Sequence, residues 1–258
     1  MTLPTSPRVD LNADMGESFG PWRMGDDAAL LGIVTSANIA CGFHAGDPDV
    51  MMKTMRLAVK KNVGIGAHPG YADLQGFGRH RMQVPHATLQ NQIRYQIGAA
   101  QAMARAAGGQ VRHLKLHGAL ANTAAEDFAL ATALYEAALS VAPDIAIMVL
   151  AATEQQAAVQ ALGCKYVCEI FADRAYNDDA TLVDRSIPGA VIHDADLAGK
   201  RITDMVLRRA IVTASGKEIP TQIDTICLHG DTPEAVDIAR AVRTGLESAG
   251  VTVTPFPV

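Results

Sequence analysis

Short runs of apolar and β-branched residues alternate along the chain with longer stretches in which apolar residues recur every three or four positions. The short runs predict strands at 8–13, 36–43, 63–67, 112–116, 145–150, 166–171 and 225–229, and the late segment VTVTPF predicts an eighth. The longer stretches predict helices at about 48–62, 86–107, 127–141, 154–162, 195–213 and 233–249. This alternation is typical of a parallel sheet covered by helices.

Seven or eight successive strand–helix units predict an α/β fold of the TIM-like (β/α) barrel class, with an open doubly wound sheet as the competing architecture. We expect one domain over residues 1–258, because no repeat, low-complexity segment or Pro/Ser-rich linker interrupts the pattern. Two helix starts are marked by a capping side chain before a proline, Asp47 before Pro48 and Thr232 before Pro233. Both architectures place active-site groups at the carboxyl ends of the strands.

The predicted strand ends carry many polar side chains. These are Asp10, Asn12, Asp14, Glu17, Asn38, His44, His68, Lys115, His117, Glu169, Asp173, Arg174, His229 and Asp231. Because side chains alternate between the two faces of a strand, Asp10, Asn12 and Asp14 share one face, and so do Lys115 and His117. In a barrel this face is the interior, where charged groups are costly unless they are paired or functional. The sequence therefore predicts a polar site at one rim of the barrel.

Two connections are longer and richer in arginine than ordinary loops between a strand and a helix. Residues 68–85 include Arg79, and residues 172–188 include Arg174 and Arg185. We expect the first loop to fold over the site and to supply a cation to an anionic substrate, and the second loop contributes Arg174, Tyr176 and Arg185.

Composition narrows the function. A formal charge of -5 and a pI near 5.9 argue against nucleic acid and anionic membranes as partners. The first ten residues lack the pattern of a signal peptide, and no apolar stretch is long enough for a membrane helix, so we expect a cytoplasmic protein. The four cysteines are expected to be free thiols, and no phosphate-loop, dinucleotide, nucleophile-elbow or HExxH motif is present.

Six ordered segments of the sequence resemble the LamB/YcsF family, whose members form the A subunit of prokaryotic 5-oxoprolinase. The segments are VDLNADMGESFGPW (9–22), ANIACGFHAGDP (37–48), IGAHPGYAD with GFGRHRM (65–82), KLHGAL (115–120), EIFADRAY (169–176) and ICLHGD (226–231). The family more often has K-P-H-G-A-L-Y-N in the fourth segment, so Leu116 and Ala121 depart from it while Lys115, His117 and Asn122 are kept.

The resemblance implies ATP-driven hydrolysis of 5-oxo-L-proline to L-glutamate, performed with separate B and C subunits. ATP, with Mg, is the implied co-substrate. The resemblance also implies a barrel related to that of metal-dependent polysaccharide deacetylases. Two alternatives stay open: a stand-alone metal-dependent deacetylase or amidohydrolase, and a non-catalytic subunit that binds a ligand and regulates its partners.

Roles follow as expectations for the polar strand ends. The expected catalytic residues are Asp14, Glu17, His44, His68, Lys115 and His117, and the expected substrate-binding residues are Asn12, Asn38, Arg79, Arg174 and His229. Asp14 or Glu17 is expected to act as general base and a histidine as acid or orienting group. Arg79 or Lys115 is expected to bind the substrate carboxylate or phosphoryl oxygens. Asp14, His44 and His68 would suit a divalent metal, which the spacing alone does not decide.

Overall fold

The computed structural model describes residues 7–257, and residues 1–6 and Val258 lie outside this range. Most of the segment 1–10, on which the expected absence of a signal peptide rests, is therefore outside the described residues. The strands are β1 (Arg8–Met15), β2 (Ser36–Ala40), β3 (Gly64–His68), β4 (Val111–Lys115), β5 (Ala146–Leu150), β6 (Tyr166–Phe171), β7 (Ala210–Val212), β8 (Glu218–Pro220), β9 (Thr225–Leu228) and β10 (Thr252–Val253). The helices are α1 (Asp27–Leu30), α2 (Pro48–Lys61), α3 (His86–Ala106), α4 (Gly118–Glu126), α5 (Phe128–Leu139), α6 (Glu154–Leu162), α7 (Ala195–Arg208) and α8 (Ala235–Ser248). That the whole of 1–258 forms one domain stays a prediction.

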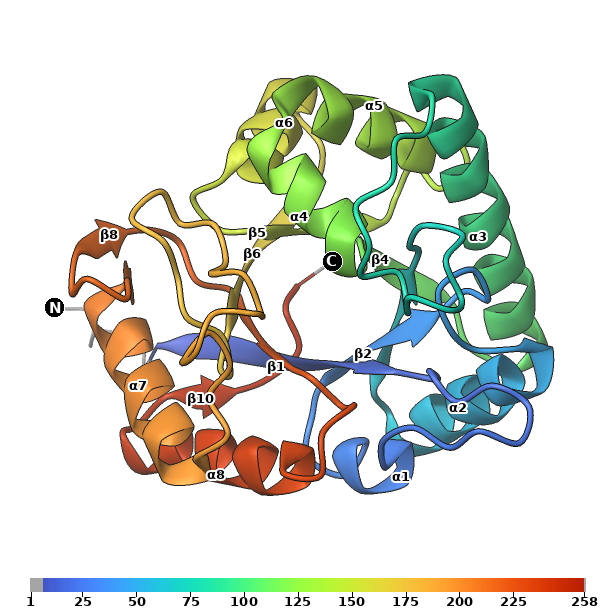
Figure 1. Cartoon of the computed structure of the whole chain (residues 1–258). Coiled ribbons are helices and arrows are strands. Elements are labelled where there is room, and N and C mark those ends of the chain that lie inside the picture. Colours follow the sequence, from blue (N-terminus) through green and yellow to red (C-terminus); the bar gives the residue numbers. More distant parts are fainter. Residues whose placement is uncertain (1–6, 258) are drawn as a thin grey trace, which may run out of the picture.

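Seven strands form a closed parallel barrel. β1 to β6 pair in chain order, β6 pairs with β9, and β9 pairs back with β1, where Asp10 lies opposite Thr225. This last pairing closes the ring, so the sheet is not an open doubly wound one. The predicted TIM-like barrel is confirmed, with seven strands in the ring and helices around it (Figure 1). The predicted eighth strand forms the short β10, which pairs with Arg8 and Val9 at the start of β1 and does not enter the ring.

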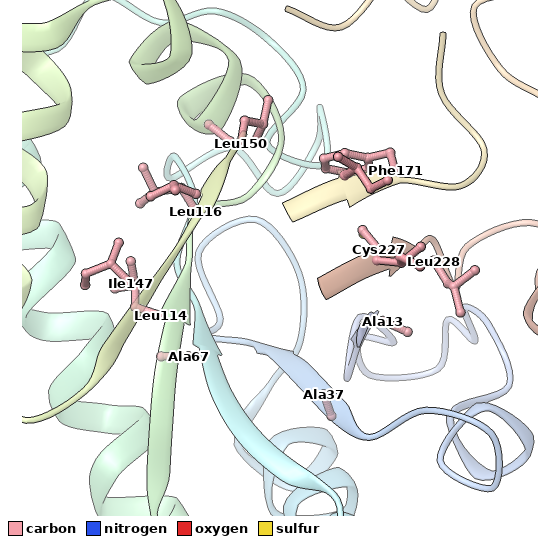
Figure 2. Close-up of a cluster of buried hydrophobic side chains, with 14 of the residues drawn as sticks. Ala13, Ala37, Ala67, Leu114, Leu116, Ile147, Leu150, Phe171, Cys227 and Leu228 are labelled. Carbon is pink, nitrogen blue, oxygen red and sulfur yellow. The ribbon is translucent and has the colours of Figure 1, made fainter. Parts of the chain in front are cut away.

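The outer faces of the strands and the facing sides of the helices form the apolar core. Every second side chain of a strand points outward, and on β1 these are Leu11, Ala13 and Met15, all of them buried. Figure 2 shows side chains of this core, among them Leu114 and Ile147. Helix α3 places its buried residues three to four positions apart, along one face.

The barrel interior is polar over much of its length. Asn38 Nδ2 donates to Asn12 Oδ1 at 2.7 Å, and His113 Nε2 donates to Asn38 Oδ1 at 2.7 Å. Asn38 and His113 belong to β2 and β4, and the strand between them carries Gly66 at this level. A Cβ at Gly66 would overlap with His113 Nε2, so the missing side chain gives the imidazole its space. The hydrogen bond across β3 depends on this glycine.

Two helices and a hairpin differ from the predicted elements. The sequence pattern does not predict α4 or α1. Helix α4 has the sequence GALANTAAE, whose small residues do not form the apolar stripe that identifies a helix, and α1 is a single turn. The helix expected over 195–213 ends at Arg208, because Arg209 adopts a left-handed conformation with φ of 53°. The apolar residues that follow it pair as β7 with β8, in line with the strand preference of isoleucine and valine.

The two predicted helix caps have different outcomes. Asp47 caps α2, because its Oδ1 accepts a hydrogen bond from the Val50 amide at 2.8 Å. The predicted cap at Thr232 is wrong, since α8 begins at Ala235 and has no side-chain cap. The segment just before α8 lies at the carboxyl end of the barrel, where Asp231 forms an ion pair with Arg79.

Gly66→Ala is expected to lower the free energy of unfolding by about 3 kcal/mol, because the new methyl group displaces the His113 ring and breaks its bond to Asn38. Urea denaturation measures this difference. Gly98→Ala is the matched control: Gly98 lies in α3 with open space around it, and alanine there should stabilise the helix by about 0.5–1 kcal/mol. Equal stability of the two variants would contradict the interior packing.

Candidate active site

Five of the polar strand-end residues line one cavity of about 570 Å³: Asp14, Lys115, His117, Arg174 and His229. Asp14, Lys115, Phe171 and His229 line it from the carboxyl ends of β1, β4, β6 and β9. Both long loops contribute to its wall. The arginines that line it are Arg79, Arg81, Arg174 and Arg185.

A buried cluster of one glutamate and three histidines lies beside the cavity. Glu17 Oε1 lies 3.3 Å from His44 Nε2 and 3.6 Å from His117 Nδ1. His117 Nδ1 lies 3.1 Å from His68 Nε2. The rings of His44 and His117 stack in parallel with centroids 3.6 Å apart, whereas the ring of His68 is perpendicular to both. The three histidines predicted at successive strand ends are thus in direct contact.

Two main-chain carbonyls fix the tautomers of this cluster. His68 Nδ1 lies 2.8 Å from the carbonyl oxygen of Lys115, and His117 Nε2 lies 2.8 Å from that of Phe77. Because a carbonyl only accepts, each of these nitrogens carries a hydrogen, and in a neutral ring the other nitrogen then carries a lone pair. Two lone pairs therefore face each other across the 3.1 Å between His68 and His117. A proton or a metal ion is needed to stabilise that arrangement.

Burial controls the electrostatics of the cluster. It lowers the pKa of His44 and of His117 well below the usual histidine value. Burial, followed by the charge of Asp14, raises the pKa of Glu17 well above the usual value. Each group alone thus favours its neutral form. A bound cation would stabilise the Glu17 carboxylate and use the histidine lone pairs.

Glu17, His68 and His117 fit a divalent metal ion. Neighbouring donor atoms lie 3.1 and 3.6 Å apart, close to the roughly 3.3 Å expected between two ligands that each lie about 2.0 Å from zinc. The lone pair of an imidazole lies in the ring plane, so the parallel rings of His44 and His117 cannot both point at one ion. His44 instead holds Glu17. The geometry therefore favours a different ligand set from the expected Asp14, His44 and His68.

Lys115 is buried inside the barrel, at the end where the strands have their carboxyl termini. Its Nζ lies 2.8 Å from Asp14 Oδ1, 3.1 Å from Glu169 Oε1 and 2.8 Å from Cys227 Sγ. Burial opposes the charged form of this lysine, but Asp14, Cys227 and Glu169 raise its pKa well above the usual value. Burial raises the pKa of Glu169, and it raises the pKa of Cys227 well above the usual value. At Asp14 burial also acts to raise the pKa, but the charges of His68 and Lys115 outweigh it and lower the pKa. Lys115 is therefore a fixed positive charge.

A second imidazole pairs with a carboxylate on the other side of the cavity. His229 Nδ1 lies 2.8 and 2.7 Å from the two carboxylate oxygens of Asp173. Burial opposes ionisation of Asp173, but the neighbouring His229 lowers the pKa of this carboxyl overall. Because the carboxylate only accepts, Nδ1 carries the hydrogen and the Nε2 lone pair of His229 faces Arg185 Nη2 at 3.1 Å. This arrangement prepares His229 to accept a proton at Nε2.

Two of the arginines in the wall are neutralised by carboxylates. Arg79 Nη2 lies 2.7 Å from Asp231 Oδ2. Arg81 forms two hydrogen bonds to the carboxylate of Glu126. Arg79, which the sequence analysis expects to bind the substrate, thus already forms an ion pair with Asp231.

The other two arginines have no carboxylate within 4 Å among residues 7–257. Arg174 donates to the carbonyl oxygens of Val183 and Ala190 at 2.6 and 3.3 Å, and burial lowers its pKa to about 10. Arg185 donates to His229 Nε2. Among residues 7–257, these two are therefore the arginines of the cavity wall that form no ion pair, although the carboxylate of Asp173 is near enough to raise the pKa of both.

Asn12 and Asn38 lie beneath the cavity rather than in its wall. Asn38 Nδ2 donates to Asp14 Oδ1 at 2.9 Å, and Asn12 Oδ1 lies 3.5 Å from Lys115 Nζ. Their position supports Asp14 and Lys115 instead of the expected direct contact with a substrate.

Several residues of the site carry no predicted role. The length of the loop 172–188 is the feature of the sequence that could have identified Arg185 as a site residue. For Asp173 that feature is its position just after a predicted strand. Cys227 and Phe77 have no such signal. A cysteine in an apolar strand is typical of core packing, and the carbonyl that orients His117 is present in every residue type.

The fold and the site define the class of protein: a parallel (β/α) barrel with buried carboxylate, imidazole and lysine groups at the carboxyl ends of its strands. The model of the LamB/YcsF family matches residues 9–258, and the chain belongs to this family. The 5-oxoprolinase A subunit of Ruegeria pomeroyi is 70% identical over 249 residues, which cover 96% of this chain and 98% of that protein. The 5-oxoprolinase A subunit of Nitrobacter hamburgensis is 52% identical over the same share of each.

Solved structures resemble the barrel to different degrees. A lactam utilization protein from Thermus thermophilus has a TM-score of 0.90 at 40% identity, over 96% of this chain and 100% of that one. A family 4 carbohydrate esterase from Streptomyces lividans has a TM-score of 0.51 at 12% identity, over 96% and 91% of the two chains, which is a likeness of fold alone. At that level it agrees with the barrel architecture described above. No helix within residues 7–257 has the length and apolar character needed to cross a membrane.

Lys115→Met is expected to lower the free energy of unfolding by about 3–5 kcal/mol, because Asp14 and Glu169 lose the charge that compensates them. Adding Glu169→Gln to this variant should recover part of the loss, since one uncompensated buried charge is removed. Arg208→Met, which breaks exposed ion pairs, is the control and should change stability far less than Lys115→Met does. Chemical denaturation that finds Lys115→Met as mild as Arg208→Met would refute this view of the barrel interior.

Proposed function

We propose that this chain is the A subunit of an ATP-dependent 5-oxoprolinase, a hydrolase that opens the lactam ring of 5-oxo-L-proline to give L-glutamate. The relatives from Ruegeria pomeroyi and Nitrobacter hamburgensis bear the 5-oxoprolinase name and align over nearly their whole length. The Thermus structure is named for lactam utilization. These names support the substrate class.

The observation that carries the proposal is the combination of groups in one cavity. Arg174 and Arg185 offer positive charge for a carboxylate, and His229 offers a lone pair for proton transfer. Leu116 and Ala121, where the sequence departs from the usual family wording, both line the cavity and offer an apolar surface to the methylene groups of a small ring. A charged five-membered lactam matches these three features.

The chemistry explains the need for ATP. A five-membered lactam is a stable amide, so its carbonyl carbon must be activated before water attacks. Transfer of the γ-phosphoryl group of ATP, as the Mg complex, to the amide oxygen releases ADP and leaves an electrophilic imidate. Water then adds to the ring carbon, and the C–N bond breaks with its electron pair going to nitrogen, which gives an acyl phosphate. A second water releases phosphate and glutamate.

The roles of the side chains follow from their contacts. His229, oriented by Asp173, accepts the proton of the attacking water and returns it to the ring nitrogen. Lys115 provides a fixed positive charge for the oxygens of the phosphoryl group as that group passes to the amide oxygen. Asp14 accepts hydrogen bonds from Lys115 and Asn38, so its proposed role is to position Lys115 rather than to act as base.

Glu17, His68 and His117 would hold a divalent metal ion in this protein, for the geometric reasons given above. Bound there, the ion would act as a Lewis acid on an oxygen of the substrate or of water. The protein keeps the three side chains ready by fixing the tautomers of both histidines through main-chain carbonyls.

The proposal includes partners and a compartment. The relatives are named as one lettered component of an oxoprolinase, which supports assembly with B and C subunits, and we assign the handling of ATP to the complex as a whole. We place the activity in the cytoplasm, where ATP is available and where the four free cysteines stay reduced.

Reconstitution tests the function. The chain is mixed with its B and C partners, ATP and 5-oxoproline, and glutamate and ADP are measured with each component omitted in turn. Equal amounts of both products are expected only in the complete mixture. His229→Gln should lower turnover at least about 100-fold, whereas His193→Gln, at an exposed imidazole beside Glu234, should not change it. Turnover by the chain alone without ATP would instead support a stand-alone amidohydrolase, and unchanged turnover with His229→Gln a regulatory role.

Metal binding is tested without turnover. After treatment with a chelator, the chain is titrated with Zn²⁺ or Co²⁺, and one equivalent is expected to bind and to raise the melting temperature. His68→Ala and His117→Ala should each weaken binding about 10- to 100-fold, and the cobalt absorption spectrum reports whether ligands are lost. His193→Ala is the control. Unchanged affinity in both cluster variants would remove the metal from the proposal.

A further inference from the structure

Arg185 occupies the one open nitrogen of the His229 imidazole. Its Nη2 donates to His229 Nε2 at 3.1 Å, while Asp173 holds the opposite nitrogen of the same ring. The Nε2 lone pair is therefore blocked in this structure. His229 can accept a proton there only after Arg185 has moved its donor elsewhere.

The contacts of Arg185 leave it free to move. Arg79 and Arg81 are held by carboxylates, and Arg174 is held by two main-chain carbonyls of its own loop. Among residues 7–257, Arg185 makes a hydrogen bond only to the neutral imidazole nitrogen of His229. Its guanidinium group has five N–H donors, so most of them remain available at the cavity wall.

An oxyanion competes well for such a donor. A hydrogen bond from arginine to a carboxylate or phosphate is about twice as strong as one between neutral groups, and the planar guanidinium group binds two oxygens at once. Arg185 would exchange one contact with a neutral nitrogen for two with an anion. Burial, and then the nearby charge of Arg79, lowers the pKa of Arg185 more than the carboxylates of Asp231, Asp173 and Asp14 raise it.

We propose that Arg185 is an anion-binding residue that couples the arrival of substrate to proton transfer: a carboxylate or phosphoryl oxyanion of the substrate draws the guanidinium group away from His229 and thereby exposes Nε2. In the phosphorylated ring, the water oxygen then bonds to the ring carbon as the π pair of the carbon–nitrogen bond passes to nitrogen, while His229 Nε2 takes the water proton. His229 gives that proton to the ring nitrogen as the C–N bond breaks and its electron pair passes to nitrogen. Until an oxyanion binds, Arg185 keeps His229 Nε2 occupied.

Only the choice of lactam as a probe and the proton-transfer role of His229 rest on the proposed function. Binding of 5-oxoproline, of 2-pyrrolidinone, which lacks the carboxylate, and of inorganic phosphate is measured by calorimetry on the chain alone, without ATP or partners. Arg185→Gln is expected to weaken binding of the anion it holds by about 10- to 100-fold and to leave 2-pyrrolidinone unaffected. Arg208→Gln, which removes an exposed arginine outside the site, should leave all three affinities unchanged.

The probes distinguish the source of the oxyanion. Weaker binding of 5-oxoproline assigns Arg185 to the substrate carboxylate, and weaker binding of phosphate alone assigns it to the phosphoryl group. Unchanged affinity for both anions, or no binding of either to the unaltered chain, overturns the proposal. A melting curve equal to that of the unaltered chain shows that Arg185→Gln is folded.

The coupling itself is tested by nitrogen-15 NMR of the imidazoles. In the unaltered chain, saturation with the bound anion should shift the His229 Nε2 resonance as the Arg185 donor leaves. In Arg185→Gln this resonance should already lie near the shifted position and respond little. If the anion does not change the His229 Nε2 chemical shift in the unaltered chain, the coupling is contradicted. Failure of reconstituted turnover with these shifts intact would instead count against the proposed function.

Discussion

The Lys115 ammonium group is the interaction on which the rest of the structure depends. It lies inside the barrel and is compensated by Asp14 of β1 and Glu169 of β6, with Cys227 of β9 as a further contact. Desolvating a charge costs several kcal/mol, so these groups can remain ionised only while they stay together. Because β4 is not adjacent to β1, β6 or β9 in the ring, the cluster sets the distances across the rim of the barrel. The side chains of the cavity come from that rim, from the loops that leave it and from helix α4, which follows β4.

Asp14 connects the two halves of the site. One carboxylate oxygen accepts from Lys115, and the other lies 3.3 Å from His68 Nε2 in the glutamate–histidine cluster. The same carboxylate also lies within 4.8 Å of a His229 ring nitrogen. A change of charge in the glutamate–histidine cluster, or at Lys115 or His229, therefore alters the electrostatic potential at Asp14 with little screening, since the groups are buried. The sites proposed for metal and for proton transfer are electrostatically coupled through this residue.

The sequence predicts the scaffold better than the contacts. The strand–helix alternation identifies the barrel, and the two-residue period of strands identifies which side chains face inward, as Asn12 and Asn38 show. It does not decide how deep they lie, because the depth depends on the stagger of neighbouring strands, and both asparagines lie below the cavity. Nor does it decide that His113, an ordinary residue of β4 by its sequence context, reaches across a glycine to Asn38. Such a contact depends on how three neighbouring strands lie against one another, which local patterns do not encode.

The loop over the histidines shows why its glycines are not simply hinges. Gly78 has φ of 62°, and a Cβ there would lie 2.7 Å from His44 Cβ and 2.8 Å from His117 Cδ2. Phe77 before it adopts φ of 55°, unusual for a bulky residue, and this conformation aims its carbonyl at His117 Nε2. The strain, of order 1–3 kcal/mol, persists because packing on the two imidazoles fixes it. The loop therefore packs closely over the two imidazoles and sets the tautomer of His117 through the carbonyl of Phe77.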